Sequence, residues 1–196
     1  MGNTVRLDTH AAATLRYIRS SMEGAMLLAV PGSAGIVLGS IALAAAGLCL
    51  APELRKYWLG IWLSAALLGA VLGSVLIVRE SSLRELRLLD TPLRKFALSL
   101  SPSLGAGLVM TAVHWYGGNL HAIPGTWLLL YGCALLTAST VTTRIIAVLG
   151  GLFVLIGLVT LLLPDEWHIV MLGAGFGGLH ILFGFLIGRM GHGRKA

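Results

Sequence analysis

Long uncharged apolar stretches alternate along the chain with short segments that hold almost all of its charges. A bilayer core about 30 Å thick is crossed by roughly 20 apolar residues in a helix, so each stretch is long enough to span a membrane. The pattern therefore predicts an all-α integral membrane protein with six transmembrane helices. The predicted spans are approximately residues 29–51, 57–78, 96–116, 125–141, 145–163 and 168–188.

A different pattern precedes the first span. Within residues 1–24, apolar side chains recur at helical spacing while charged side chains lie elsewhere on the wheel, which predicts an amphipathic helix on the cytoplasmic membrane surface. The apolar set is Leu7, Ala11, Leu15, Ile18 and Met22. Docking of a soluble partner is the alternative role for such a helix. The chain thus divides into this helix, a transmembrane domain over residues 25–189 and a cytoplasmic tail over residues 190–196.

Basic residues orient the predicted bundle. Of the 14 Lys and Arg residues, all but Arg55 and Lys56 fall on one side, at the two ends of the chain or in the second-to-third and fourth-to-fifth connections. The positive-inside rule then places both termini in the cytoplasm, and we expect a bacterial inner membrane. Charged residues make up only 11% of the chain against 57% hydrophobic, which excludes a soluble enzyme. Loops beside anionic lipid explain the formal net charge of +6 without a nucleic-acid partner.

Two internal similarities leave the arrangement of the spans open. In one, the first two spans match the last two: LGS from Leu38 corresponds to LGG from Leu149, and each pair has an outer proline and tryptophan. This similarity favours three hairpins. In the other, AVPGS from Ala29 matches AIPGT from Ala122, which would relate the first and fourth spans as an inverted pair.

No Asp, Glu, Lys or Arg falls near the midplane of a predicted span. The exception to this absence of ionisable side chains is a histidine, His180. A buried ionisable group is costly and is often functional. It needs water or a hydrogen-bond partner, and the hydroxyls of Ser64 and Thr111 are among the candidates, so these three residues form a candidate midplane polar site. His180 is then either a structural histidine or a proton-sensing or solute-binding group.

Small residues recur at steps of three and four, a spacing that lets helix backbones approach closely. We expect tight helix-packing seams along two such stripes, and His180 lies on the first. The stripes are Gly173, Gly177, Gly184 and Gly188 in the sixth span, and Ala65, Gly69 and Gly73 in the second. Packing within a homo-oligomer is the alternative role for either stripe.

Three tryptophans open the three helices that descend from the outer interface. An indole ring has an apolar body and a polar N–H group, which suits the headgroup level of a membrane. Trp58, Trp127 and Trp167 are therefore predicted interface anchors.

No pattern predicts catalysis, a metal site or a cofactor. A histidine among glycines in a sixth span resembles the rhomboid proteases, yet where that family has Gly-x-Ser-Gly in its fourth helix this chain reads YGCA from Tyr131. The two cysteines, Cys49 and Cys133, lie at different predicted depths, and two thiols alone do not make a zinc site. We therefore predict a protein that is not an enzyme.

The stretch LGGLFVLIGLVTLLLPDEWHIVMLGAGFGGLHILFGFLIG, from Leu149 to Gly188, joins a glycine-rich ascending helix, an outer proline and a glycine-rich return. It resembles the HdeD-type acid-resistance membrane proteins, and this resemblance implies six helices, a stress-associated role and no catalytic residue. The strings LRYIRSSME, PGTWLLLYG and GFGGLHILFG are similar to an uncharacterised family of small six-span bacterial inner-membrane proteins.

Two functional hypotheses follow from these patterns. The leading one is a non-enzymatic multi-pass inner-membrane protein with a stress-associated or accessory role, which binds a cytoplasmic protein partner through residues 1–24 and 79–95. The alternative is a small permease or channel for an uncharged or weakly basic solute that passes His180. The second hypothesis requires water near the midplane, and the first does not.

Overall fold

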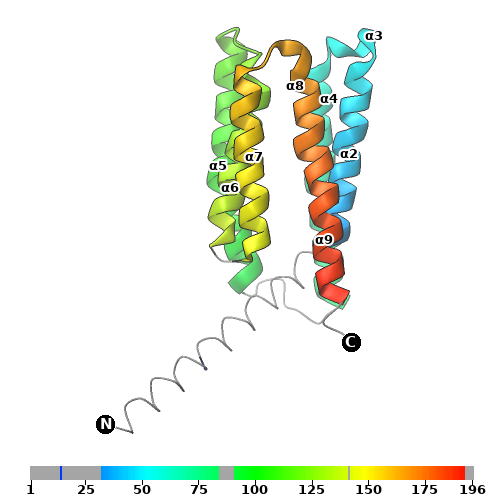
Figure 1. The fold of residues 1–196 in the computed structure, drawn as a ribbon, viewed down its shortest axis with the longest axis vertical. Coiled ribbons are helices and arrows are strands. Elements are labelled where there is room, and N and C mark those ends of the chain that lie inside the picture. Colours follow the sequence, from blue (N-terminus) through cyan, green and yellow to red (C-terminus); the bar gives the residue numbers. More distant parts are fainter. Residues whose placement is uncertain (1–13, 15–31, 84–90, 141, 193–196) are drawn as a thin grey trace, which may run out of the picture.

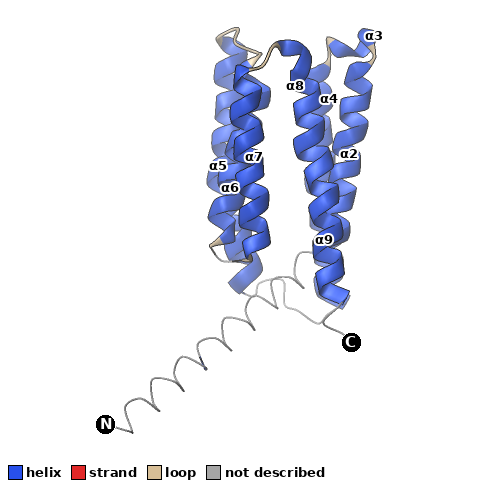
Figure 2. Cartoon of the chain, in the orientation of Figure 1, coloured by secondary structure: helices blue, strands red, loops and turns tan. Residues whose placement is uncertain are grey.

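The computed structural model describes residues 14, 32–83, 91–140 and 142–192 of the chain. Within these residues the secondary structure is helical, without strands (Figure 2). Among the described residues, six helices are long and apolar enough to cross a membrane, which confirms the predicted all-α fold class. The predicted amphipathic helix over residues 1–24 falls almost wholly outside the described part of the chain, and so do the last residues of the predicted tail.

Five of the spans are single helices and the sixth is composite. The single helices are α2 (Gly32–Leu50), α4 (Trp58–Leu83), α5 (Thr91–Tyr116), α6 (Ala122–Ser139) and α7 (Arg144–Leu162), and the one-turn helix α3 (Pro52–Arg55) joins α2 to α4. The sixth span begins with the 3-10 turn η1 (Asp165–Trp167) and continues through α8 (His168–Leu172), the π-helical segment η2 (Gly173–Leu179) and α9 (His180–His192). A π-helix is rare and was not expected from the 3.6-residue periodicity of the sequence.

The six spans pack as two units of three helices (Figure 1). In the first unit, α2 lies between α4 and the sixth span; in the second unit, α6 lies between α5 and α7. The first two predicted hairpins, α2 with α4 and α5 with α6, are therefore packed pairs. The fifth and sixth spans are joined at one end but belong to different units, because α7 packs mainly on α6 and the sixth span mainly on α2.

Glycines explain this choice of partners. A Cβ atom added at Gly35 on α2 would lie 3.0 Å from the Cα atom of Gly184 on α9, so the two backbones are nearly in contact. Gly132 on α6 and Gly150 on α7 meet in the same way in the second unit. Because a side chain at any of these positions would force the helices apart, glycine pairs decide which spans can lie close together.

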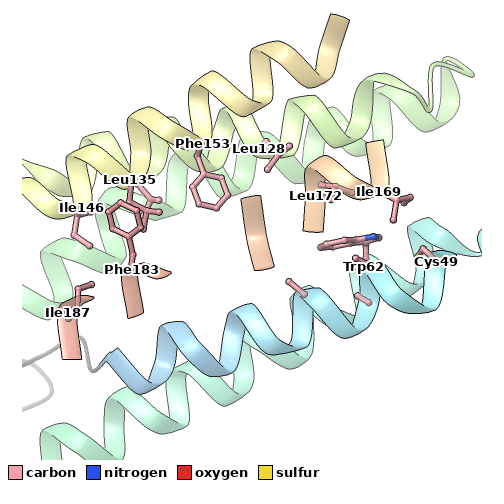
Figure 3. Close-up of a cluster of buried hydrophobic side chains, with 14 residues drawn as sticks. Cys49, Trp62, Leu128, Leu135, Ile146, Phe153, Ile169, Leu172, Phe183 and Ile187 are labelled. Carbon is pink, nitrogen blue, oxygen red and sulfur yellow. The ribbon is translucent and has the colours of Figure 1, made fainter. Parts of the chain in front are cut away.

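The two units meet along a layer of buried side chains, which we call the seam (Figure 3). The second unit contributes Leu128 and Leu135 of α6 and Phe153 of α7, and the sixth span contributes Leu172 and Phe183. Figure 3 shows these side chains between the helices, with Phe183 close to Leu135. The space between the ribbons in Figure 1 is thus occupied by packed side chains.

The opposite faces of the outer helices are covered with exposed aliphatic side chains. Leu67 and Val71 on α4, and Leu108 and Val109 on α5, are each more than half exposed. Such a surface is suited to lipid tails, so the bilayer is the environment that these faces require.

Candidate functional site

A hydrogen bond between two polar side chains joins the units near the middle of the spans. The hydroxyl oxygen of Tyr131 on α6 lies 2.8 Å from Nε2 of His180, the first residue of α9. His180 is only 8% exposed, and a buried polar group of this kind requires such a partner. The partner is a tyrosine from the second unit, so this bond crosses the seam.

Aromatic rings surround the Tyr131–His180 pair. Phe153 on α7 is fully buried and lies edge-on to both members, with ring centroids 4.9 Å from Tyr131 and 5.4 Å from His180. Phe176 on η2 lies 5.2 Å from Tyr131 and 5.3 Å from Phe153. Trp62 on α4 completes the cluster at 6.2 Å from Phe176. These distances and tilts are those of favourable aromatic contacts, so the centre of the seam is closed by rings.

The π-helical segment η2 carries Phe176 and leads directly into His180. Its sequence is GAGFGGL, in which every residue except Phe176 and Leu179 is glycine or alanine. A Cβ atom at Gly175 would overlap the side chain of Leu128 and lie 3.3 Å from the Phe153 ring, so glycine lets both side chains reach the sixth span. Segments of π-helix often mark functional positions, because their hydrogen-bonding pattern is strained relative to an α-helix.

Two buried nitrogen atoms in this cluster, Nδ1 of His180 and Nε1 of Trp62, have only weak or poorly aligned hydrogen-bond partners. Nδ1 of His180 lies near the backbone oxygens of Gly175 and Phe176, and Nε1 of Trp62 lies beside the thiol of Cys49 on α2 (Figure 3). A thiol sulfur is a weak acceptor, and a buried polar group left wholly unsatisfied costs about 1–3 kcal/mol. Water or a polar solute would therefore pair with these two nitrogens more strongly than their present partners do.

Trp127 on α6 connects three helices. Its Nε1 donates a hydrogen bond of 2.7 Å to Oγ1 of Thr111 on α5, and its ring lies 6.4 Å from that of Trp58 on α4. Thr111 in turn donates to the backbone oxygen of Gly107. Trp127 and Trp58 thus pack against each other across the units, whereas Trp167 in η1 is 50% exposed, and the role of all three as interface anchors stays a prediction.

The structure does not assemble the polar site that was expected around His180. Ser64 is exposed on α4, and Thr111 bonds Trp127, so neither hydroxyl reaches the histidine. The hydroxyl that reaches His180 belongs to Tyr131 and not to a serine or threonine. The only sequence signal for Tyr131 is its place beside Gly132, where α6 packs closely on α7.

The small-residue stripes lie along helix contacts of the first unit. In the sixth span, Gly173, Gly177 and Gly184 face Ala46, Leu43 and Ile36 of α2, and Gly188 lies against Gly32. In α4, Gly69 and Gly73 face Leu38 of α2, and Ala65 packs against the buried cluster. His180 was expected to find its partner on the helix that the stripe contacts. It lies at the edge of the stripe instead, so its side chain reaches α6 while the glycines contact α2.

The chemistry available at the seam is hydrogen bonding and ring packing. No group of three or more His, Cys, Asp or Glu side chains that could hold a metal ion occurs among the described residues. Comparisons of the chain with protein-family models, with curated proteins and with solved structures found no match.

Proposed function

We propose that this multi-pass membrane protein is a non-enzymatic permease for a small uncharged or weakly basic solute, which crosses between the two three-helix units at the seam. The observation that carries the proposal is the Tyr131–His180 hydrogen bond, which places a polar pair between the units near the middle of the spans. A bundle with only a structural task could fill this position with apolar side chains at no cost in unsatisfied polar atoms.

The packing supports two bodies that move relative to each other. Within each unit one pair of helices is held by backbone contacts at glycines, Gly35 with Gly184 in the first unit and Gly132 with Gly150 in the second. Between the units the contacts are side chains, mainly aromatic rings and leucines. Side chains can change rotamer, whereas close backbone contacts cannot adjust without parting the helices, so the seam is the place where the protein would open.

In this proposal, the structure corresponds to the closed state and the Tyr131–His180 bond is its latch. A typical net hydrogen bond contributes about 1 kcal/mol, which is roughly a fivefold change in an equilibrium between closed and open states. The solute would take the place of this bond by forming hydrogen bonds of its own with Tyr131 and His180.

The class of solute follows from the residues of the spans. Asp, Glu, Lys and Arg are missing from the middle of every predicted span in the sequence. A fully charged solute would therefore enter an apolar passage without a counter-charge, at a high cost in free energy. An uncharged molecule, or a weak base that crosses in its neutral form, avoids this cost.

We further propose a bacterial inner membrane, with both termini in the cytoplasm, as the setting of this activity. The accessory role through a cytoplasmic partner stays a prediction from the sequence. Most of its docking segments, residues 1–24 and 79–95, lies outside the described residues.

Solute entry into proteoliposomes tests the proposal. The purified protein is reconstituted, an inward gradient of urea, glycerol or methylamine is applied, and swelling is followed by light scattering. At least one of these solutes should enter faster than it enters protein-free liposomes. Tyr131→Phe should raise that rate about fivefold, because it removes the latch and shifts the equilibrium toward the open state.

Tyr57→Phe is the matched control, because Tyr57 lies in the turn just before α4 and is 58% exposed. It should behave as the unmodified protein. The proposal is wrong if no solute enters faster than in protein-free liposomes with either the unmodified protein or Tyr131→Phe. Equal rates for Tyr131→Phe and Tyr57→Phe would refute the latch.

A further inference from the structure

Phe176 occupies an unusual position, because its ring is in contact with four other rings. The centroid distances are 5.2 Å to Tyr131, 5.3 Å to Phe153 and 6.2 Å to both Trp62 and His180. These four residues come from α4, α6, α7 and α9, and we call them the aromatic cage. Both units contribute walls, so the cage lies within the seam.

The occupant of the cage is the large side chain best able to move. Phe176 is the central residue of η2, and glycine or alanine stands at each of the two positions before it and the two positions after it. Glycine offers little resistance to backbone rearrangement, and π-helical turns convert to α-helical ones by shifting one residue in register. Phe176 is also only partly buried, whereas Phe153 is fully buried, so Phe176 is the less confined of the two phenylalanines.

Three of the four cage walls carry polar atoms. The hydroxyl of Tyr131 and Nε2 of His180 bond each other, so the cage has a polar edge. Nδ1 of His180 and Nε1 of Trp62 are poorly paired, lying near backbone oxygens of η2 and the thiol of Cys49, and both side chains are more than nine-tenths buried. The ring of Phe176 forms no hydrogen bond with any of these atoms, because it is a hydrocarbon.

We propose that the aromatic cage is the binding site for a planar, uncharged solute with a hydrogen-bonding edge, and that Phe176 occupies this site in the closed protein. This inference rests on the permease proposed above and specifies its substrate class. The four rings accept a flat molecule of about the size of the phenyl group that they now hold. Its polar edge bonds Tyr131 or His180, and its lack of charge matches a cage without an ionic side chain.

The role of Phe176 follows from competition for the same space. While its ring lies in the cage the solute cannot bind, and when η2 withdraws the ring the cage is open. The apparent affinity for solute is then reduced by the fraction of molecules in which the cage is open. Removing the Phe176 ring should remove this competition and leave the other walls in place.

Phenol is a suitable probe, because it is planar, uncharged near neutral pH and has one hydroxyl group. Binding is measured by equilibrium dialysis of radiolabelled phenol against the full-length protein in nanodiscs, with the signal from protein-free nanodiscs subtracted. Cyclohexanol tests the need for a flat ring, and benzoate tests the exclusion of charge. The unmodified protein should bind phenol saturably and should bind the other two at least tenfold more weakly.

Phe176→Ala should bind phenol about tenfold more tightly than the unmodified protein does, if the cage is open in about a tenth of molecules. Phe185→Ala is the matched control, because Phe185 lies on α9 and is 51% exposed. It should leave phenol binding unchanged. Phe176→Leu, which loses less volume, serves if the alanine variant does not fold, and it should tighten binding in the same direction.

The inference is overturned if phenol does not bind saturably, or if the folded Phe176 variants bind it no more tightly than Phe185→Ala does. The two proposals fail separately. Phenol binding without any protein-dependent solute entry into proteoliposomes would keep the cage and refute the permease. Entry of urea or glycerol without phenol binding would keep the permease and refute the cage.

Discussion

Gly132 on α6 offers the most direct test of the idea that glycine contacts hold each unit together. A methyl group at this position would lie 2.6 Å from the backbone nitrogen of Val154 and 2.7 Å from the backbone oxygen of Gly150, both on α7. Ordinary van der Waals contact begins at 3.4 Å. Gly132→Ala therefore requires α6 and α7 to part by about 0.8 Å, and backbone atoms cannot turn aside as a side chain can.

Overpacking of this kind costs about 1–3 kcal/mol of unfolding free energy. Gly151→Ala is the matched control, since a methyl group at Gly151, on the facing helix α7, would meet nothing within 4 Å. The control should be neutral or stabilising by up to about 1 kcal/mol, because alanine has a higher helix propensity than glycine. The gain in helix propensity applies to both variants, so they should differ by the overpacking cost alone, about 1–3 kcal/mol, although each adds one methyl group.

The assay is equilibrium unfolding in mixed micelles, followed by circular dichroism as the mole fraction of denaturing detergent rises. Gly132→Ala should unfold at a lower mole fraction than the unmodified protein, and Gly151→Ala at the same or a higher one. If both variants unfold together with the unmodified protein, the close contact between α6 and α7 does not exist and the division into two units loses its basis.

Three further predictions concern the Tyr131–His180 bond, the Trp127–Thr111 bond and the orientation of the protein in the membrane. In a double-mutant cycle with Tyr131→Phe and His180→Phe, unfolding free energies should show a coupling of about 1 kcal/mol, and additive effects would mean that the two side chains do not interact. Thr111→Val should lower the unfolding free energy by about 1–2 kcal/mol because it leaves Nε1 of Trp127 without an acceptor, whereas Thr137→Val, at an exposed site, should change it by less than about 0.5 kcal/mol. In intact cells of a cysteine-free variant, Glu53→Cys should react with an impermeant maleimide and Thr140→Cys should not, and the reverse pattern would invert the proposed orientation.

The helices could be predicted from the sequence because the bilayer imposes a simple rule. About 20 residues without charge are needed to cross it, and the chain meets this rule in six places. α4 nonetheless continues to Leu83, beyond the predicted limit of 57–78, since Arg79 and the residues after it are compatible with a helix that leaves the bilayer. Hydrophobicity indicates where a chain is buried in lipid, but it does not show where a helix ends.

The pairing of the spans could not be predicted in the same way. Repeats along the chain favoured a hairpin of the fifth and sixth spans, yet these spans lie in different units. The decisive contacts, such as Gly184 with Gly35, join residues far apart in sequence, and a glycine stripe does not show which neighbour it will contact.

The partner of His180 was missed for a related reason. The sequence suggested that a midplane histidine needs a hydroxyl, and this chemical requirement is met by Tyr131. The ring of a tyrosine is largely apolar, so Tyr131 is hard to distinguish by sequence alone from the apolar residues around it in its span. The aromatic cage depends on tertiary packing together with the π-helical segment η2, and neither has a signature in the spacing of apolar residues.

The central claim is that the seam opens to water, and thiol labelling tests it most directly. Two variants are made in a Cys49→Ser, Cys133→Ser background, each with one new cysteine. One carries His180→Cys, and the other carries Phe183→Cys, which keeps the Tyr131–His180 bond. Ala134→Cys is the control, because Ala134 on α6 is fully buried and lies outside the seam cluster. Thiols react as thiolates, which form in water, so a membrane-impermeant maleimide reports access from either side of sealed vesicles. We expect both seam cysteines to be labelled in folded protein while Ala134→Cys stays unlabelled. If all three cysteines react only after denaturation, the seam does not open and the protein is not a permease.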